Sequence, residues 1–508
     1  MLDLALIGEG LDLLLRPGVV LAILGGMTLG LVIGTIPGLT AALGLAVILP
    51  LTFSLDALTA LVLMTSVYTG SLTGGGFLAV LLNTPGTPGA AATTFDGYPM
   101  ARAGRASEAL GLQLAASVIG GFLSYLALLA FVQPMARFAL LFGTAEMLFL
   151  VIFVILLIAT LQRRSWSRTI FAGLLGLLLS NVGTSVSTGV PRGTMGIDAL
   201  EDGLPIILVV IGMFAVPELI QIVARGRISE RADGARQDLA ALLGGARRAL
   251  SLPGTWGPGS LVGIVVGLLP AAGATIASLL SYSLAARRAR PGERFGEGEP
   301  KGVVAAESAN NASEGGAMAI LMSLGIPGSA STAVILGGFL VHGLVPGPRL
   351  FVDDGALVYG LIIGNLVQML LLGVVAVAVA SQVARIATVP SSILAPCLVV
   401  LLALGAYAYR GQFADVVITF LAGWIGYLFR RHHFTLISLM IGLFLGRQLD
   451  EDIVRFAILY GDDPAALLER PLVVVLMLAS AGLFAWQLVA AVRERRVGAG
   501  SASGAAPS

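Results

Sequence analysis

The sequence predicts an all-α polytopic membrane protein of two homologous halves with broken or re-entrant helices, roughly 10 to 12 spans plus hairpins. Of its residues, 57% are hydrophobic and 12% are charged, whereas soluble domains carry about 25% charged residues. The chain also holds 66 glycines and 23 prolines. Since Gly and Pro weaken a helix, many helices are expected to be interrupted.

The same composition argues against several classes of function. The formal charge is +1 and Lys301 is the single lysine, so we expect no nucleic-acid partner. One cysteine and three histidines are too few for a Cys/His metal site, and we expect no metal centre and no cofactor. No nucleophile with a base stands in the spans, so we expect no enzyme.

Uncharged apolar runs of about 20 residues predict the spans. Residues 1–17 carry acids instead of a basic start and are expected to lie at the membrane interface. The clearest spans follow at 109–132, 145–161, 204–224, 355–384, 390–409, 413–429 and 471–492. Arginine clusters near 163, 225–248, 287–294, 430 and 493 predict the cytoplasmic side. The acidic stretch 450–463 is then outside, and a disordered tail, 494–508, is inside.

The segment 258–286 is long enough to cross once, yet arginines flank both of its ends. A single crossing would violate the charge rule. Its middle reads GLLPAAGAT, where Pro270 and Gly273 can end one short helix and begin another. We therefore expect a re-entrant hairpin with both ends on the cytoplasmic side. The alternative is one Pro-kinked span whose arginines snorkel to the surface.

Two motifs recur in the same order. GLVIGTIPGLTAALG (30–44) matches GIVVGLLPAAGATIAS (263–278), pairing Gly34 with Gly267 at an offset of 233. TGGGFLAVLLNTPGTPGAAATT (73–94) matches SEGGAMAILMSLGIPGSASTA (313–333), at offsets of 240 (Gly75 with Gly315) and 239 (Gly89 with Gly328). The expected parts are an interfacial segment (1–17), repeat one (18–130), connecting spans and a cytoplasmic loop (131–257), repeat two (258–385), C-terminal spans (386–493) and the tail. We prefer inverted over parallel repeats.

Interrupted segments at matching positions of duplicated halves indicate a transporter binding site, because broken helices present backbone groups to a solute. Both breaks are rich in hydroxyl and amide groups, and a helix start attracts anions. We therefore expect a carboxylate solute between 83–94 and 323–332, although any one of these residues could instead serve helix packing. The candidates are Asn83, Thr84, Thr87, Pro88, Gly89, Thr93, Asn310, Asn311, Ser323, Gly325, Pro327, Gly328, Ser329 and Ser331.

Acids at membrane depth bind a proton or a cation. Asp96, Glu307 and Glu314 are therefore candidates for coupling transport to a sodium or proton gradient. For Asp96 a surface N-cap or turn is the alternative, and Glu307 could lie at the interface because it follows a polar stretch.

The quoted strings resemble the large membrane subunit of the tripartite tricarboxylate transporters (TctA-like). The resemblance runs from about 18 to 475, and its further strings include STGVPRGTMGIDALEDGLPIILVVIGMFAVPEL (187–219), VVAAESANNASEGGA (303–317) and LGAYAYRGQFADV (404–416). It implies a multi-pass protein of the bacterial inner membrane that imports carboxylates by symport with sodium or protons. It also implies two partners, a small membrane subunit and a periplasmic binding protein that delivers the solute.

Three positions depart from the pattern of that family. Ala271 replaces a glycine, Ala285 and Ala286 stand near a position where relatives often carry an acid, and Lys301 replaces an acid. The solute is therefore less certain than the family, and a dicarboxylate or an aromatic acid is the alternative. An ion channel is a third hypothesis for the function. Channels, however, usually build one filter from several identical subunits, whereas this chain duplicates its motif internally.

Overall fold

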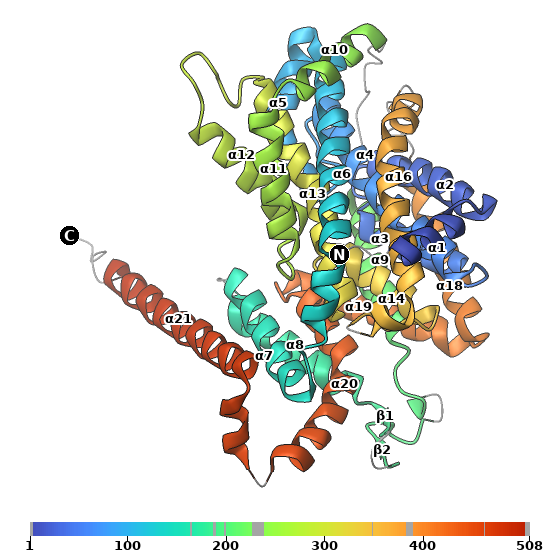
Figure 1. The fold of residues 1–508 in the computed structure, drawn as a ribbon, viewed down its shortest axis with the longest axis vertical. Helices are drawn as coiled ribbons and strands as arrows, with labels where there is room; N and C mark the ends of the chain where they lie inside the picture. The colour runs from blue at the N-terminus through green and yellow to red at the C-terminus, as the bar shows by residue number, and fades with distance from the viewer. Residues whose placement is uncertain are drawn as a thin grey trace. The chain divides into compact units, whose positions relative to one another are not determined.

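The computed structural model describes residues 4–162, 165–185, 189–197, 200–225, 238–347, 349–380, 382, 390–461 and 463–502 (Figure 1). Helix contacts divide the chain into two compact units, each described by itself. Unit 1 comprises 1–140 and 205–428, and unit 2 comprises 141–204 and 429–508. The expected connecting segment, 131–257, is thus divided between the units. Arginines 163, 164, 227, 231 and 236 lie outside the described residues.

Unit 1 contains both repeats. Its first part runs through α1 (Leu4–Leu14), α2 (Pro17–Gly34), α3 (Ala41–Ile48), η1 (Leu49–Thr52), α4 (Ala57–Leu82), η2 (Pro88–Ala90), α5 (Thr93–Met100), η3 (Ala101–Arg105) and α6 (Ala106–Ala139). Its second part runs through α9 (Ile206–Arg225), α10 (Leu239–Leu250), α11 (Pro253–Gly267), α12 (Gly273–Arg287), α13 (Pro300–Leu324), α14 (Ala330–Val341), α15 (Leu350–Asp353), α16 (Gly355–Ala380), α18 (Ser391–Arg410) and most of α19 (Phe413–Arg431).

Unit 2 consists of α7 (Thr144–Leu161), α8 (Trp166–Ser180), β1 (Gly183–Thr184), β2 (Pro191–Arg192), α20 (Leu436–Tyr460), η6 (Pro464–Glu469) and α21 (Pro471–Ala502). β1 and β2 pair antiparallel. Close backbone approach joins α8 to α20, since a Cβ on Gly176 would lie 2.1 Å from the carbonyl oxygen of Leu439. The acidic stretch is anchored where Arg192 Nη1 lies 2.9 Å from Asp450 Oδ1.

Within the described residues, nine helices are long and apolar enough to cross a membrane, or ten if one bent pair counts as a span. All seven predicted spans are matched by candidate spans, and the other two candidates are α2 and α4 of repeat one. Residues 381, 383 and 384, at the end of the predicted span 355–384, lie outside the described residues. The number of candidate spans, nine or ten, lies at or below the lower limit of the predicted 10 to 12. The reason is that several apolar helices, 41–52, 166–180 and 330–341, are short. The chain is therefore a multi-pass membrane protein.

The C-terminal end differs from expectation. α21 continues to Ala502, where a disordered tail from 494 was expected. The sequence AAVRERR (490–496) consists mostly of good helix formers, which accounts for the extension as far as Arg496. Residues 503–508 of the expected tail lie outside the described residues.

The hairpin predicted at 258–286 is confirmed. α11 ends at Gly267 and α12 begins at Gly273, and between them Ala271 has a positive φ of 62°. The first turn of α11 and the last turn of α12 line one cavity, so both ends of the hairpin lie on the same side. Upstream, α10 meets α11 at a bend of 76°.

Glycines bring the paired helices of each repeat into backbone contact. A Cβ on Gly30 or Gly34 of α2 would lie 2.4 or 2.2 Å from a carbonyl oxygen of α4. In repeat two, a Cβ on Gly263 or Gly267 of α11 would lie 2.5 or 2.3 Å from a carbonyl oxygen of α13. No side chain fits at such distances, so both halves share one way of packing.

This packing corrects the register of the second motif. Gly34 packs against the carbonyl of Ser71, and Gly267 packs against the carbonyl of Ser313. Ser71 and Ser313 are therefore equivalent, at an offset of 242. Farther along, Gly86 packs against the carbonyl of Gly34 as Gly328 packs against that of Gly267, again 242 apart. The sequence pairing at 239 and 240 is therefore wrong by two or three residues. It failed because NTPGTPG contains two Pro-Gly pairs, and the first is the structural match.

The matching helices α4 and α13 run antiparallel. Gly76 lies against Glu307, Thr73 bonds Asn311, and Thr69 bonds Glu314, so numbers fall along one helix as they rise along the other. Equivalent helices of opposite direction are what inverted repeats produce. The packing therefore agrees with the preferred inverted arrangement.

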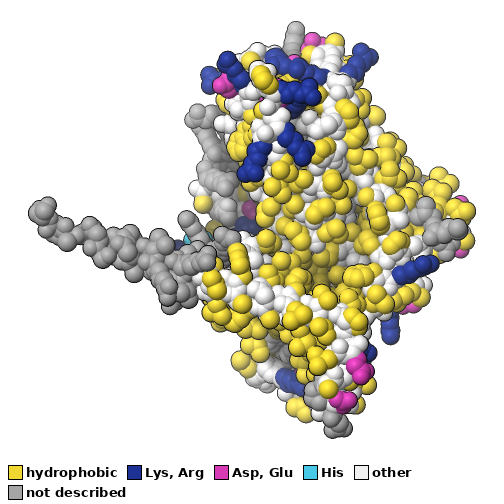
Figure 2. Space-filling view, turned by 60° about the vertical axis from the view of Figure 1, so that its left-hand side comes forward, with side chains coloured by type: hydrophobic (Ala, Val, Ile, Leu, Met, Phe, Trp, Pro, Cys, Tyr) yellow, Lys and Arg dark blue, Asp and Glu magenta, His cyan; other side chains and the backbone are white. Residues whose placement is uncertain are grey.

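Basic side chains gather at one end of unit 1. Figure 2 shows them at the end that carries α10 in Figure 1, beside a surface dominated by hydrophobic side chains. Glu108 there pairs with both Arg105 and Arg248 at 2.8 and 2.9 Å. The sequence predicts that the arginine clusters at 225–248 and 287–294 share the cytoplasmic side, and this clustering agrees with that prediction.

Candidate functional site

The centre of unit 1 is the polar face of α13. All residues of this helix from 302 to 323 are buried, and Glu307, Asn310, Asn311 and Glu314 have no exposed surface. Their spacing of three, four and seven residues places them on one face of the helix. An apolar environment makes such groups expensive unless they find partners.

Glu307 is surrounded by hydrogen-bond donors from four side chains. Thr93 donates at 2.5 Å, Ser117 at 3.0 Å and Gln113 at 3.3 Å. Asn310 adds its amide at 3.4 Å. Because these donors come from α5, α6 and α13, Glu307 joins the break of repeat one to two long helices. It lies in the buried interior of unit 1, not at its surface.

Glu314 has a different environment. Its Oε1 accepts from Thr69 at 2.5 Å and from Tyr125 at 2.8 Å. Gln368 of α16 in turn donates to Thr69 at 2.7 Å. Oε2 has no hydrogen-bond partner in the described part of the chain. One carboxylate oxygen is therefore available to bind a cation or a proton.

The two asparagines link α13 to repeat one. Asn311 donates to Thr73 at 3.0 Å. The Oδ1 atom of Asn310 faces Gly89, where an added Cβ would lie only 2.2 Å away. Within the described residues, six buried oxygen atoms around this cluster have no hydrogen-bond partner: Ser71 Oγ, Thr87 Oγ1, Gln113 Oε1, Asn310 Oδ1, Asn311 Oδ1 and Glu314 Oε2.

The break of repeat one turns back along its own helix. α4 ends at Leu82, and the next residue, Asn83, has the left-handed conformation with φ 53°. The N–H of Gly86 then donates to the carbonyl of Gly75 at 3.2 Å. Among the candidates here, Thr87, Gly89 and Thr93 are buried, whereas Asn83, Thr84 and Pro88 are exposed. Of the buried three, Gly89 and Thr93 approach α13, and Thr87 lies against Gly75 of α4.

The break of repeat two begins at Gly325, with φ 69°. Ser329 caps α14 by accepting from the N–H of Thr332, as expected for a helix start, and lies 3.4 Å from the hydroxyl of Tyr68. Ser323 bonds its own helix at Ala319. The remaining candidates at this turn, Pro327, Gly328 and Ser331, are all buried.

The structure brings only some of these candidates into direct contact. Gly89 contacts Asn310 and Thr93 donates to Glu307. Ser329 contacts Tyr68. Tyr68 and Gly75, where the two breaks reach α4, are seven residues apart, or about 10 Å along the helix. The breaks thus approach the crossing of α4 and α13 from two ends, and the buried polar cluster lies between them.

Asp96 serves a separate contact. Its Oδ1 accepts from the N–H groups of Gly296, Gly298 and Glu299 at 2.8–2.9 Å, and its Oδ2 accepts from Tyr282 at 2.9 Å. Four donors fully satisfy a carboxylate. Asp96 therefore holds the loop after α12 against α5.

A family model for the tripartite tricarboxylate transporter TctA family matches residues 20–441, which include all of α4, α13 and both breaks. The chain belongs to the TctA family. It is therefore a component of a tripartite transporter system of the kind that defines this family. TctA is a transporter family, not an enzyme family.

Two relatives of this TctA-family chain come from Agrobacterium vitis. One, an uncharacterized 52.8 kDa protein in the TAR-I ttuC' 3'region, is 31% identical over 96% of each chain. The other, an uncharacterized protein in the TAR-II ttuC' 3'region, is 30% identical over 42% of this chain and 89% of its own length. No solved structure matches.

Sequence reasoning missed the residues of α6 and α16 that complete the cluster. Gln113, Ser117 and Tyr125 lie in a run whose composition predicts only an apolar span, and Gln368 lies in another such run. A signal was present, because Gln113, Ser117 and Ser124 recur at four and seven residues and so share one helix face. All of them fall inside the TctA match.

Proposed function

We propose that this chain is the large membrane subunit of a secondary importer that carries a tricarboxylate or related organic acid across the bacterial inner membrane. A periplasmic binding protein delivers the solute, and a small membrane subunit completes the complex. Membership of the TctA family supports this proposal. The observation that carries it is the buried polar cluster between two broken helices, one from each repeat.

The solute is held between the two breaks at the crossing of α4 and α13. Hydroxyl and amide groups there, including those of Thr87, Asn310 and Asn311, can donate to carboxylate oxygens. The free Oδ1 of Asn310 faces Gly89, so rotation of this one carboxamide changes the polar contacts of both halves. Alternating access then requires each break to open in turn.

The coupling cation, sodium or a proton, binds at Glu314. Its Oε2 is the buried carboxylate oxygen without a partner in the described residues, and its two donors are neutral hydroxyls. A carboxylate in an apolar interior needs a proton or a cation for neutrality. Glu307 and Asp96 accept larger sets of donors, which favours positioning roles for both.

Uptake into vesicles that hold this chain with its two partners tests the proposal. We expect saturable uptake of one member of a labelled carboxylate panel, driven by an imposed sodium or proton gradient. Asn310→Ala should raise the apparent KM about tenfold, because a lost hydrogen bond to a charged group costs about 1.5 kcal/mol or more.

Asn181→Ala is the matched control, since Asn181 donates only within α8, to Leu177. Its uptake should equal that of the wild type. Unchanged uptake and KM in Asn310→Ala would remove the solute from this site. Absence of uptake for every carboxylate, with the complex shown to assemble, would refute the solute class.

A further inference from the structure

A second polar site lies at the basic end of unit 1, apart from the buried cluster. A cavity of about 400 Å³ opens between the first turn of α11 and the last turn of α12. Its lining includes three cations, Arg288, Arg290 and Lys301, and one anion, Glu293. Neither the transport mechanism nor the repeat motifs use these residues.

The charges of this cavity do not balance. The ammonium of Lys301 and the backbone N–H of Arg290 donate to Glu293, which holds the pKa of that carboxyl below its usual range. Glu293 therefore stays ionised at neutral pH and neutralises Lys301. In the part of the chain that the structure describes, no carboxylate pairs with the guanidinium groups of Arg288 or Arg290, so the cavity carries excess positive charge.

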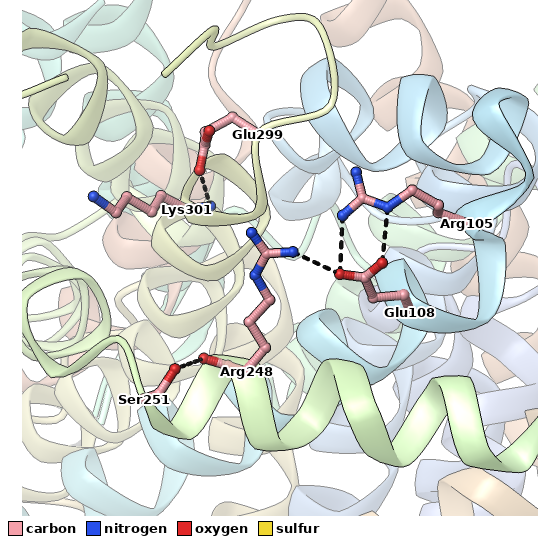
Figure 3. A network of polar contacts seen from close by, with 6 residues as sticks. All are labelled: Arg105, Glu108, Arg248, Ser251, Glu299 and Lys301. Carbon is pink, nitrogen blue, oxygen red and sulfur yellow. Dashed lines mark hydrogen bonds and ion pairs between the residues drawn. The ribbon is translucent and has the colours of Figure 1, made fainter. Parts of the chain in front are cut away.

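The neighbouring acids are already engaged. Figure 3 shows Glu108 between Arg105 and Arg248, and Glu299 accepting from the backbone N–H of Lys301 at the start of α13. Arg248 also accepts through its carbonyl from Ser251, a residue that lines the cavity. One carboxylate thus serves two arginines beside the cavity, which adds to the positive field.

The helices beside the cavity have the composition expected at a membrane surface. α10 carries exposed Leu239, Leu243 and Leu250 beside Arg247 and Arg248, the composition of a helix that lies in the interface. It meets α11 at a bend of 76° directly before the cavity. The next exposed residues of α11 are apolar, with Leu261 at 63% and Val265 at 51%, as expected for contact with lipid tails.

The lining itself is amphipathic. Thr255 contributes a hydroxyl, and the hydroxyl of Ser281 already donates to the carbonyl of Ala305. Pro258, Val262 and Leu284 are apolar and continue toward the exposed side chains of α11. The start of α11 adds the positive end of a helix dipole. A small soluble anion would use the charges and leave the apolar wall without a role.

We propose that this cavity binds the phosphate group of an anionic phospholipid, with its acyl chains along the apolar surface of α11 and α12. Basic pockets at the cytoplasmic ends of membrane helices bind such headgroups. The proposal does not depend on which solute the protein carries. A lipid here ties the hairpin of repeat two to the membrane surface.

The test compares two double variants of the full chain purified in a neutral detergent. Arg288→Gln with Arg290→Gln removes the two cavity arginines. Arg287→Gln with Arg294→Gln removes the same charge from the same segment, at exposed positions that do not line the cavity. Binding of phosphatidylglycerol, phosphatidylcholine and inorganic phosphate is measured by native mass spectrometry, and melting temperatures show that both variants are folded.

We expect the wild type to retain phosphatidylglycerol in preference to phosphatidylcholine. The cavity variant should lose affinity for phosphatidylglycerol by about tenfold, while the control variant changes little. Equal losses in both variants would mean general surface attraction and would overturn the proposal. Binding of inorganic phosphate with the affinity of the lipid would also overturn it, in favour of a soluble anion.

Discussion

The helices α4 and α13 occupy equivalent places in the two repeats, yet they differ in what they carry. In both, backbone carbonyl groups contact glycines of the preceding helix, and the contacted residues of α4 and α13 are 242 positions apart. At the positions of Glu307, Asn310, Asn311 and Glu314 in α13, however, α4 has Thr65, Tyr68, Thr69 and Leu72. The two helices therefore share backbone packing but not ionisable groups.

This difference shows that helix packing and the placement of ionisable groups are separate requirements on the same fold. Close packing of broken helices is needed in both halves, because each break must be held against the helix that it follows. A carboxylate at membrane depth is costly, so it is expected only where it is used. The proposed chemistry thus lies on one helix, and the other supplies hydroxyls to it through Thr69 and Thr73.

The largest effect is expected at Glu314. Glu314→Gln keeps the shape of the side chain but cannot bind a coupling cation, so gradient-driven uptake should fall by roughly a hundredfold, corresponding to about 2–3 kcal/mol for a charged contact. Glu307→Gln should instead lower the melting temperature, because an amide N–H2 would face the hydroxyls and amides that now donate to Glu307. Uptake and melting temperature of both variants decide between these roles, and normal coupled uptake in Glu314→Gln would contradict the asymmetry.

The next effect tests the packing that the halves share. Gly34→Ala and Gly267→Ala should each destabilise the protein by about 2 kcal/mol or more, because the new Cβ would lie 2.2 or 2.3 Å from a backbone carbonyl oxygen. Thermal unfolding in detergent measures the change. Gly25→Ala and Gly257→Ala are matched controls in the same two helices, where an added Cβ meets nothing within 4 Å. Equal stability of all four variants would show that the close contacts do not hold the repeats together.

A smaller effect on solute affinity is expected at Tyr68, the residue of α4 that is equivalent to Asn310 of α13. Tyr68 and Asn310 occupy the same position in the two repeats. Tyr68→Phe loses one contact of 3.4 Å to Ser329, so apparent affinity should change by threefold or less, about 0.5 kcal/mol. A change in KM as large as that of Asn310→Ala would mean that both halves contribute equally to the solute site.

The last comparison concerns the turns between the first two helices of each repeat. Gly38 and Ala271 are equivalent at an offset of 233, and both have positive φ, 92° and 62°. Ala271→Gly should stabilise the protein by about 1 kcal/mol, because L-residues are strained in the left-handed region, and Gly38→Ala should destabilise it by a similar amount. Melting temperatures of the two variants should move in opposite directions, and a shift in the same direction would refute the equivalence of these turns.

The sequence by itself determined the helices, their interruptions and the family. A span needs a long apolar run, and clustered Pro and Gly favour a break in a helix, so the hairpin at 258–286 and the capped start at Ser329 could be predicted from local residues. Glu307 and Glu314 were recognisable because ionisable groups stand out in an apolar chain. These are properties of short segments and need no knowledge of their neighbours.

Only the tertiary structure decided which residues meet. The repeat register of 242 depends on where glycines contact carbonyls of another helix, and two adjacent Pro-Gly pairs in the sequence could not be told apart. Three of the donors to Glu307 and Glu314, namely Gln113, Ser117 and Tyr125, come from α6, a span whose polar residues look incidental until α13 packs against them. Likewise, the loop that Asp96 holds lies 200 residues away in the chain. Such contacts arise from backbone geometry between distant segments, which composition and periodicity do not record.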